Sequence, residues 1–205
     1  MTTPSREEIR RQRRQRMDQR LQQAQQGAQR QRLMSRLRAG ALIGLLVLVV
    51  GLGVFWVFRE ATAPLPGQPV ADEGRTHVDT GSPLSFATYP PASGAHYENT
   101  ARWDFYDSEV SPGFWVHNLE HGGVVLLYKC PSSCAELKSQ LKGLTSSLRR
   151  SKYGYVKLVV APDNNIQGQV VALAWDRREV LESFDANTLQ RFYEAYVDHG
   201  PEDAP

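Results

Sequence analysis

The feature that most constrains the fold of this 205-residue chain is a run of twenty uncharged, mostly apolar residues from Ala39 to Phe58. With a rise of about 1.5 Å per residue, a helix of this length is about 30 Å long and matches the hydrocarbon core of a bilayer. The alternative is a buried core helix, but core helices seldom continue for so long without a polar stripe. Trp56 and Phe58 lie where aromatic side chains favour the headgroup region. We therefore expect a single N-terminal transmembrane helix over residues 39–58.

The distribution of charge predicts the orientation of this helix. Residues 1–38 contain eleven Arg and three acidic residues, a local net charge of +8, whereas the rest of the chain has a net charge of −6. By the positive-inside rule, 1–38 is a basic cytoplasmic segment and residues after about 60 lie outside the cytoplasm. The basic segment has no aromatic residue to stack on a base, which argues against nucleic-acid binding. We expect a single-pass protein of the cell membrane with its C-terminal domain outside the cytoplasm.

A cleaved signal peptide is the alternative to an uncleaved signal anchor. Ala61-Thr62-Ala63 has the small-x-small form of a cleavage site. The apolar run is longer than that of a signal peptide, however, and Pro64 would follow the cut. These features favour the anchor.

The remainder of the chain divides into a linker and one domain. Residues 59–74 contain three Pro and two Gly and predict a semi-extended spacer. Residues 75–205 are long enough for one core, with a first part rich in Pro and Gly and a second part with regular patterns. We expect an α+β fold of two layers, with a mixed or antiparallel sheet and two main helices. The expected elements are strands at 124–128, 155–161 and 170–175, a turn at 176–178, a leucine-patterned helix after a capping box at 133–136, and a helix capped by Asp185 and ended at 200–201.

All five histidines of the chain lie in this expected outer domain. His117, Glu120 and His121 form the H-x-x-E-H pattern of one zinc peptidase class, which needs a helix that continues through the motif. Gly122 and Gly123 follow the motif directly, and the flanking residues 114–116 and 124–128 have the composition of strands. We therefore do not favour a peptidase.

Two longer motifs carry a resemblance to a known family. They are YPPASGAHY at 89–97 and VHNLEHGGVV at 116–125, followed by Pro201-Glu202. With these motifs the chain resembles the bacterial domain-of-unknown-function family 3105 over about 75–202. Ala95 stands where the family pattern has Pro. The resemblance implies a membrane anchor and an extracytoplasmic domain, and it implies no established activity.

The histidines have two interpretations. Imidazoles that converge from separate loops commonly bind zinc or copper, and Glu120 can serve as a ligand or as an acceptor for an imidazole N–H. The candidate metal ligands are His77, His96, His117, His121 and Glu120. Alternatively, neutral imidazoles tie loops together through hydrogen bonds without a metal. All three Met precede residue 39, which excludes a Met-rich copper(I) site in the domain, and His199 is interpreted as structural.

Cys130 and Cys134 are the two cysteines of the chain. Outside the cytoplasm a local disulfide is the default for such a pair. The alternative is a thiol–disulfide oxidoreductase, because a strand followed by cysteines at a helix N-terminus resembles the thioredoxin arrangement. The spacing is C-x-x-x-C rather than C-x-x-C, however. We expect a binding or structural module rather than an enzyme, because no serine elbow, phosphate loop or paired catalytic carboxylates occur. A protein partner in the envelope would leave no decisive sequence pattern.

Overall fold

The computed structural model describes residues 17, 34, 40–56 and 64–205. The chain divides into two compact units, residues 1–63 and 64–205, and each is described by itself. In the first unit, residues 40–56 are helical and exposed. No helix among the residues that the structure describes is long and apolar enough to cross a membrane. The described residues do not include the basic segment 1–38, apart from residues 17 and 34, or the ends of the expected span. They also do not include residues 59–63, which contain the considered cleavage site.

The second unit is built on a five-stranded mixed sheet with the order β1-β7-β6-β4-β5. β4 and β5 pair in parallel, whereas β4 with β6, β6 with β7 and β1 with β7 are antiparallel. This arrangement confirms the predicted α+β class with a mixed sheet. The strands are β1 (Gln68–Pro69), β4 (Val124–Tyr128), β5 (Leu158–Pro162), β6 (Val170–Ala174) and β7 (Arg177–Leu181).

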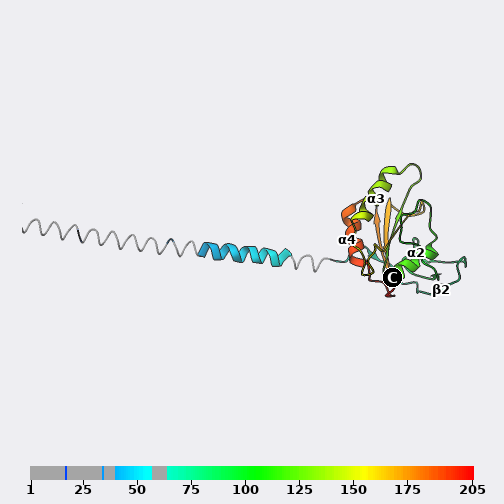
Figure 1. Ribbon diagram of the computed structural model, residues 1–205, viewed down its shortest axis with the longest axis horizontal. Helices are drawn as coiled ribbons and strands as arrows, with labels where there is room; N and C mark the ends of the chain where they lie inside the picture. Colours follow the sequence, from blue (N-terminus) through cyan, green and yellow to red (C-terminus); the bar gives the residue numbers. More distant parts are fainter. Residues whose placement is uncertain (1–16, 18–33, 35–39, 57–63) are drawn as a thin grey trace, which may run out of the picture. The chain divides into compact units, whose positions relative to one another are not determined.

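Helices cover both faces of this sheet, so the domain has three layers and not the expected two. On one face, side chains such as Leu126 and Val160 pack with α3 (Ala135–Ser147) and α4 (Ala186–Tyr196). On the other face, the alternate side chains of the strands pack against α2 (Pro112–Glu120) and its flanking loops. Figure 1 shows α3 and α4 on one side of the strands and α2 on the other. All five residues of β4 are buried, as a strand covered on both faces requires.

α2 corrects the expectation that residues 114–116 belong to a strand. The helix begins after Ser111, whose hydroxyl oxygen accepts a hydrogen bond from the Gly113 N–H at 3.4 Å. Pro112 occupies the first helical position, where its fixed φ favours a helix and its missing N–H costs nothing. The aromatic and branched residues that suggested a strand are held in the helix by burial of Trp115 and Val116 against the sheet.

Three smaller differences and one agreement concern element ends. β7 begins at Arg177, where a turn was expected, because the reversal is made by Asp176 with a φ of 56°. β5 includes Pro162 and begins at Leu158 rather than at 155. α3 begins after Cys134 with no side-chain cap, so the predicted capping box does not form. Asp185 caps α4 as predicted, since its side chain accepts from two backbone amides.

Candidate metal centre

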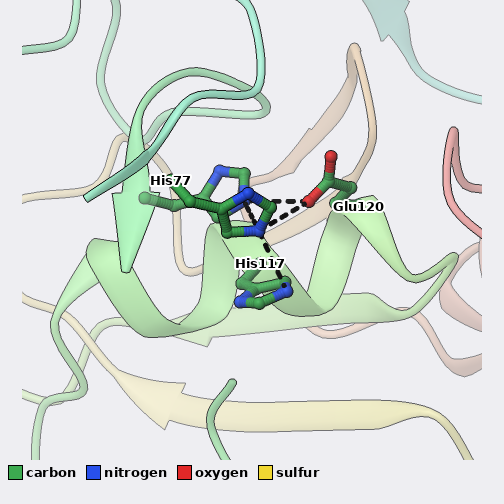
Figure 2. A group of neighbouring side chains, drawn as sticks. His77, His117 and Glu120 are labelled. Atoms are coloured by element: carbon green, nitrogen blue, oxygen red, sulfur yellow. Dashed lines mark hydrogen bonds and ion pairs between the residues drawn. The ribbon is translucent and has the colours of Figure 1, made fainter. Parts of the chain in front are cut away.

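The candidate ligands come from two structural elements on the α2 side of the domain. β2 (His77–Val78) and β3 (His96–Tyr97) form a short parallel pair in which His77 lies beside His96. α2 contributes His117 and Glu120, three residues apart and therefore on one face of the helix. Figure 2 shows the side chains of His77, His117 and Glu120 pointing toward one another.

Three imidazole nitrogens and one carboxylate oxygen converge at this point. Nε2 of His96 lies 3.2 Å from Nε2 of His77 and 2.9 Å from Oε2 of Glu120. Nε2 of His77 lies 3.4 Å from Nε2 of His117 and 3.4 Å from Oε2 of Glu120. All four ligand atoms lie within 4.8 Å of one another. We call these four residues the inner group.

Backbone carbonyls fix which nitrogen of each buried imidazole faces the inner group. Nδ1 of His96 lies 2.7 Å from the carbonyl oxygen of Gly94, and Nδ1 of His117 lies 2.8 Å from that of Tyr97. A carbonyl oxygen can only accept, so both Nδ1 atoms carry the proton and donate. A neutral ring then leaves Nε2 as a lone pair directed at the centre of the inner group. Metal-binding histidines commonly have this second hydrogen bond, which fixes the tautomer.

Burial adds to the electrostatic character of the inner group. His96, His117 and Glu120 are buried, with relative exposures of 0%, 6% and 2%. Burial and the nearby His121 imidazole lower the pKa of His117 to about 4, while its hydrogen bond to the Tyr97 carbonyl acts in the opposite direction. His117 is therefore neutral near pH 7, in the form that binds metal ions. His77 is the accessible member, with 40% of its side chain exposed.

Most of the separations between the ligand atoms are close to those of a tetrahedral metal site. An ion held at about 2.0–2.1 Å by nitrogen and oxygen ligands separates those ligands from one another by about 3.3–3.4 Å. Four of the six separations among the ligand atoms run from 2.9 to 3.4 Å, and the remaining two, from His117 to His96 and to Glu120, lie within 4.8 Å. With the proton of His96 on Nδ1, its Nε2 lone pair and the Glu120 carboxylate oxygen at 2.9 Å repel each other unless a proton or a cation lies between them. The inner group thus has the residue types, the tautomers and the spacing to hold a single ion.

Comparison with known proteins places this site within a family. A family model described as a protein of unknown function (DUF3105) matches residues 77–205. The chain belongs to the DUF3105 family. The match begins at His77 and includes every residue of the inner group, which agrees with the family expected from the sequence motifs. Neither the curated proteins nor the solved structures contained a significant match.

His121 does not join the inner group of this DUF3105 domain, although the sequence placed it among the candidate ligands. It lies at the C-cap of α2, and its ring centroid is 4.5 Å from that of His117. Its Nε2 lies 3.6 Å from Oε2 of Glu202. His117, His121 and Glu202 form a second set of ligand atoms within 4.8 Å of one another. Glu202 was noted as part of the family motifs but was missed as a ligand, because its sequence position does not show that it lies beside a helix end eighty residues earlier.

The peptidase interpretation of H-x-x-E-H does not fit this geometry, for a reason that differs from the expected one. The motif does lie on a helix, but α2 ends at Glu120 and His121 is already outside it. Glu120 occupies a ligand position beside His96 rather than that of a base beside two ligating histidines. His199 lies outside both ligand sets, and its N–H caps α4 by donating to the Tyr196 carbonyl at 3.0 Å.

The two cysteines of the DUF3105 domain lie between β4 and α3, and Cys130 follows Glu120 by ten residues. The structure pairs Cys130 with Cys134, with their Cα atoms 5.7 Å apart. The N–H of Cys130 donates to Oδ1 of Asn164 at 2.9 Å. Both cysteines are half-buried, and Cys134 is the N-cap of α3. The pair therefore joins the end of a core strand to the start of a helix.

Proposed function

We propose that the domain of residues 64–205 is a metal-binding module that holds one zinc ion through His77, His96, His117 and Glu120. One observation carries the proposal: three Nε2 atoms and one carboxylate oxygen converge within 4.8 Å of one another, with the proton of both buried imidazoles already placed on Nδ1. Imidazole and carboxylate ligands in a tetrahedral set suit zinc, whereas copper(II) favours a tetragonal arrangement.

The ligand set suits a structural or exchangeable ion better than a catalytic one. Catalytic zinc sites have three protein ligands and an open position, whereas here four protein ligands complete a tetrahedron. The ion would connect β2 and β3, which are only two residues long, to the helix α2. Because His77 is exposed, the bound ion would still exchange with solvent.

We also propose that this module is anchored to the cell membrane and lies outside the cytoplasm. The proposal rests on the apolar run of residues 39–58 and on the eleven Arg that precede it. A pair of cysteines joined across a short loop is consistent with an oxidising compartment.

Elemental analysis of the full-length chain tests metal binding. The protein is purified in detergent without a tag, stripped with a chelator and titrated with zinc or with cobalt(II), whose visible absorption reports four-coordinate geometry. We expect about one ion per chain, and a His96→Ala or Glu120→Ala variant that binds none. His199→Ala is the matched control, because it removes an exposed histidine outside both ligand sets and retains binding.

Two results would contradict the proposal. A wild-type chain that remains folded, by circular dichroism, and binds neither zinc nor copper would mean that the inner group is a metal-free network. In that network a protonated His96 would donate to both Gly94 and Glu120. Binding of copper in preference to zinc would keep the inner group as a metal site but would contradict zinc as its ion.

A second candidate function is thiol–disulfide exchange through Cys130 and Cys134. The observation that favours it is their position in a parallel β4-α3-β5 unit, with Cys134 at the helix N-terminus, where a thiolate is stabilised. Equilibration with glutathione measures the reduction potential of the pair. A potential below about −300 mV would make the disulfide structural and would reject exchange.

A further inference from the structure

We propose that His121 and Glu202 form a loading site, which binds the incoming metal ion and transfers it to the inner group through His117. This inference rests on the proposed metal-binding function and concerns how the same ion reaches its site. It assigns a role to the second set of ligand atoms, which the inner group does not use.

The position of Glu202 is set by the backbone and not by chance contact of a mobile end. The N–H of Glu202 donates to the Glu120 carbonyl at 3.0 Å, and the N–H of Asp198 donates to the Gly122 carbonyl at 2.8 Å. These bonds hold the segment 198–202 against the C-terminal end of α2. The approach is close: a Cβ added to Gly200 would meet the Glu120 carbonyl oxygen at 2.1 Å. The backbone of Glu202 is therefore held beside the helix end that carries His121, and its carboxylate lies within reach of that imidazole.

Lys157 also anchors the same region. Its buried ammonium donates to the backbone carbonyl of His121 at 2.8 Å and also to that of Ala204. The helix end and the segment that carries Glu202 thus share one anchoring side chain. The two side chains of the loading site are held at a defined separation, with His121 Nε2 3.6 Å from Glu202 Oε2.

His117 belongs to both ligand sets, so a metal ion can occupy only one of the two sets at a time. Nδ1 of His117 donates to the Tyr97 carbonyl, so Nε2 is the nitrogen with a lone pair for an ion. One nitrogen binds one ion at a time. The two sets therefore act in sequence on a single ion and do not form two independent sites.

The exposed fractions of the ligand side chains indicate the direction in which the ion moves between the two sets. The side chain of Glu202 is 48% exposed and that of His121 is 14% exposed. In the inner group, His77 is 40% exposed and is the alternative point of entry, whereas His96 and Glu120 are 0% and 3% exposed. An exposed carboxylate attracts cations from solvent, and the adjacent imidazole supplies the second ligand. The ion would then be passed from an accessible pair, through the shared His117, to the buried ligands.

Stopped-flow measurement of metal uptake tests this route. Full-length protein in detergent is stripped of metal and mixed with zinc, and release is followed with a chromophoric chelator. In His121→Ala and Glu202→Gln, we expect the uptake and release rate constants to fall together by about tenfold, as a barrier raised by about 1.4 kcal/mol would produce. Because a loading site is an intermediate on the path, the dissociation constant would change by less than about twofold and the stoichiometry would stay at one.

The control and the contrary outcomes separate this inference from the function on which it depends. Glu182→Gln neutralises an exposed carboxylate outside both ligand sets and should leave both rates unchanged. Unchanged rates in His121→Ala and Glu202→Gln, with zinc still bound, would overturn the loading site and leave the inner group intact. A large loss of affinity would overturn it too, because the two residues would then be ligands of the final site. Absence of any zinc binding to the wild-type chain would reject the proposed function itself.

Discussion

Lys157 is buried where a charged side chain is costly, and its contacts explain how it is tolerated. Besides the carbonyls of His121 and Ala204, its Nζ lies 4.2 Å from the ring centroid of Tyr153 and 4.0 Å from Oδ1 of Asp198. The burial lowers the pKa of Lys157, and the nearby Asp198 carboxylate acts in the opposite direction. The side chain thus joins a core strand to the last residues of the domain.

Replacing Lys157 by Met tests this role. The variant retains most of the apolar stem but leaves two carbonyl oxygens without their charged donor. We expect the free energy of unfolding to fall by about 2–3 kcal/mol, which is the scale of a lost hydrogen bond to a charged group. Urea denaturation followed by circular dichroism measures it. Lys152→Met, which removes an exposed lysine, should have a much smaller effect, and an equal loss in both variants would contradict the anchoring role.

Single residues also show how far the structure agrees with the sequence reasoning. His77, His96, His117 and Glu120 were recognisable as candidate ligands from residue type and clustering, and the structure brings these four together. His121 was included because it belongs to the same motif. It lies one residue beyond the end of α2, and it belongs to the second set of ligand atoms instead of the inner group. This difference depends on where α2 ends, which residue types alone did not reveal.

At the scale of elements, α4 depends on its N-terminal cap. Oδ1 of Asp185 accepts from the N–H of Asn187 at 3.0 Å, and its Oδ2 accepts from the hydroxyl of Thr188 at 2.7 Å. These bonds favour the ionised carboxylate, so the Thr188 hydroxyl and the backbone amides hold the pKa of Asp185 below its usual range. The carboxylate also suits the positive end of the helix dipole.

We predict that Asp185→Ala lowers the thermal midpoint at pH 7 by removing this cap. Because the folded-state pKa is depressed, the stabilisation is present above the pKa of the unfolded chain and is lost as the pH falls through the folded-state value. The difference between wild type and variant should therefore narrow at acidic pH. Thermal scans from pH 7 downward measure it, and Asp185→Asn should retain much of the cap at every pH. A difference that is constant with pH would exclude an ionised cap.

The predicted elements and the missed elements differ in whether the local sequence pattern agrees with the tertiary packing. β4 and β6 are continuous apolar runs and α4 carries an amphipathic helical pattern, and tertiary packing agrees with these signals. α2 combines β-favouring residues with a helix, so packing overrode local propensity; its start signal, Ser111-Pro112, is brief. β7 begins with charged residues of intermediate exposure, and its start therefore resembled a turn.

At the scale of the whole molecule, the proposed topology has a direct test. Alkaline phosphatase fused after Pro205 should be active, because it folds only outside the cytoplasm, whereas a green fluorescent protein at the same position should be dark. Fusions of both reporters after Arg38 should give the reverse result, because that position precedes the apolar run. A fluorescent, phosphatase-negative fusion after Pro205 would place the domain in the cytoplasm. The domain would then not lie in an oxidising compartment.

The β2–β3 pair contains four residues, and its parallel backbone bonds have few neighbours to reinforce them. The five-stranded sheet, in contrast, is covered on both faces. With an ion at the inner group, opening of the layer near residues 75–97 would require a ligand to leave the metal. Amide hydrogens in that layer should therefore exchange with deuterium faster after chelation, while those of the central strands keep their protection. The domain would then consist of a permanent scaffold and a layer whose order depends on the ion.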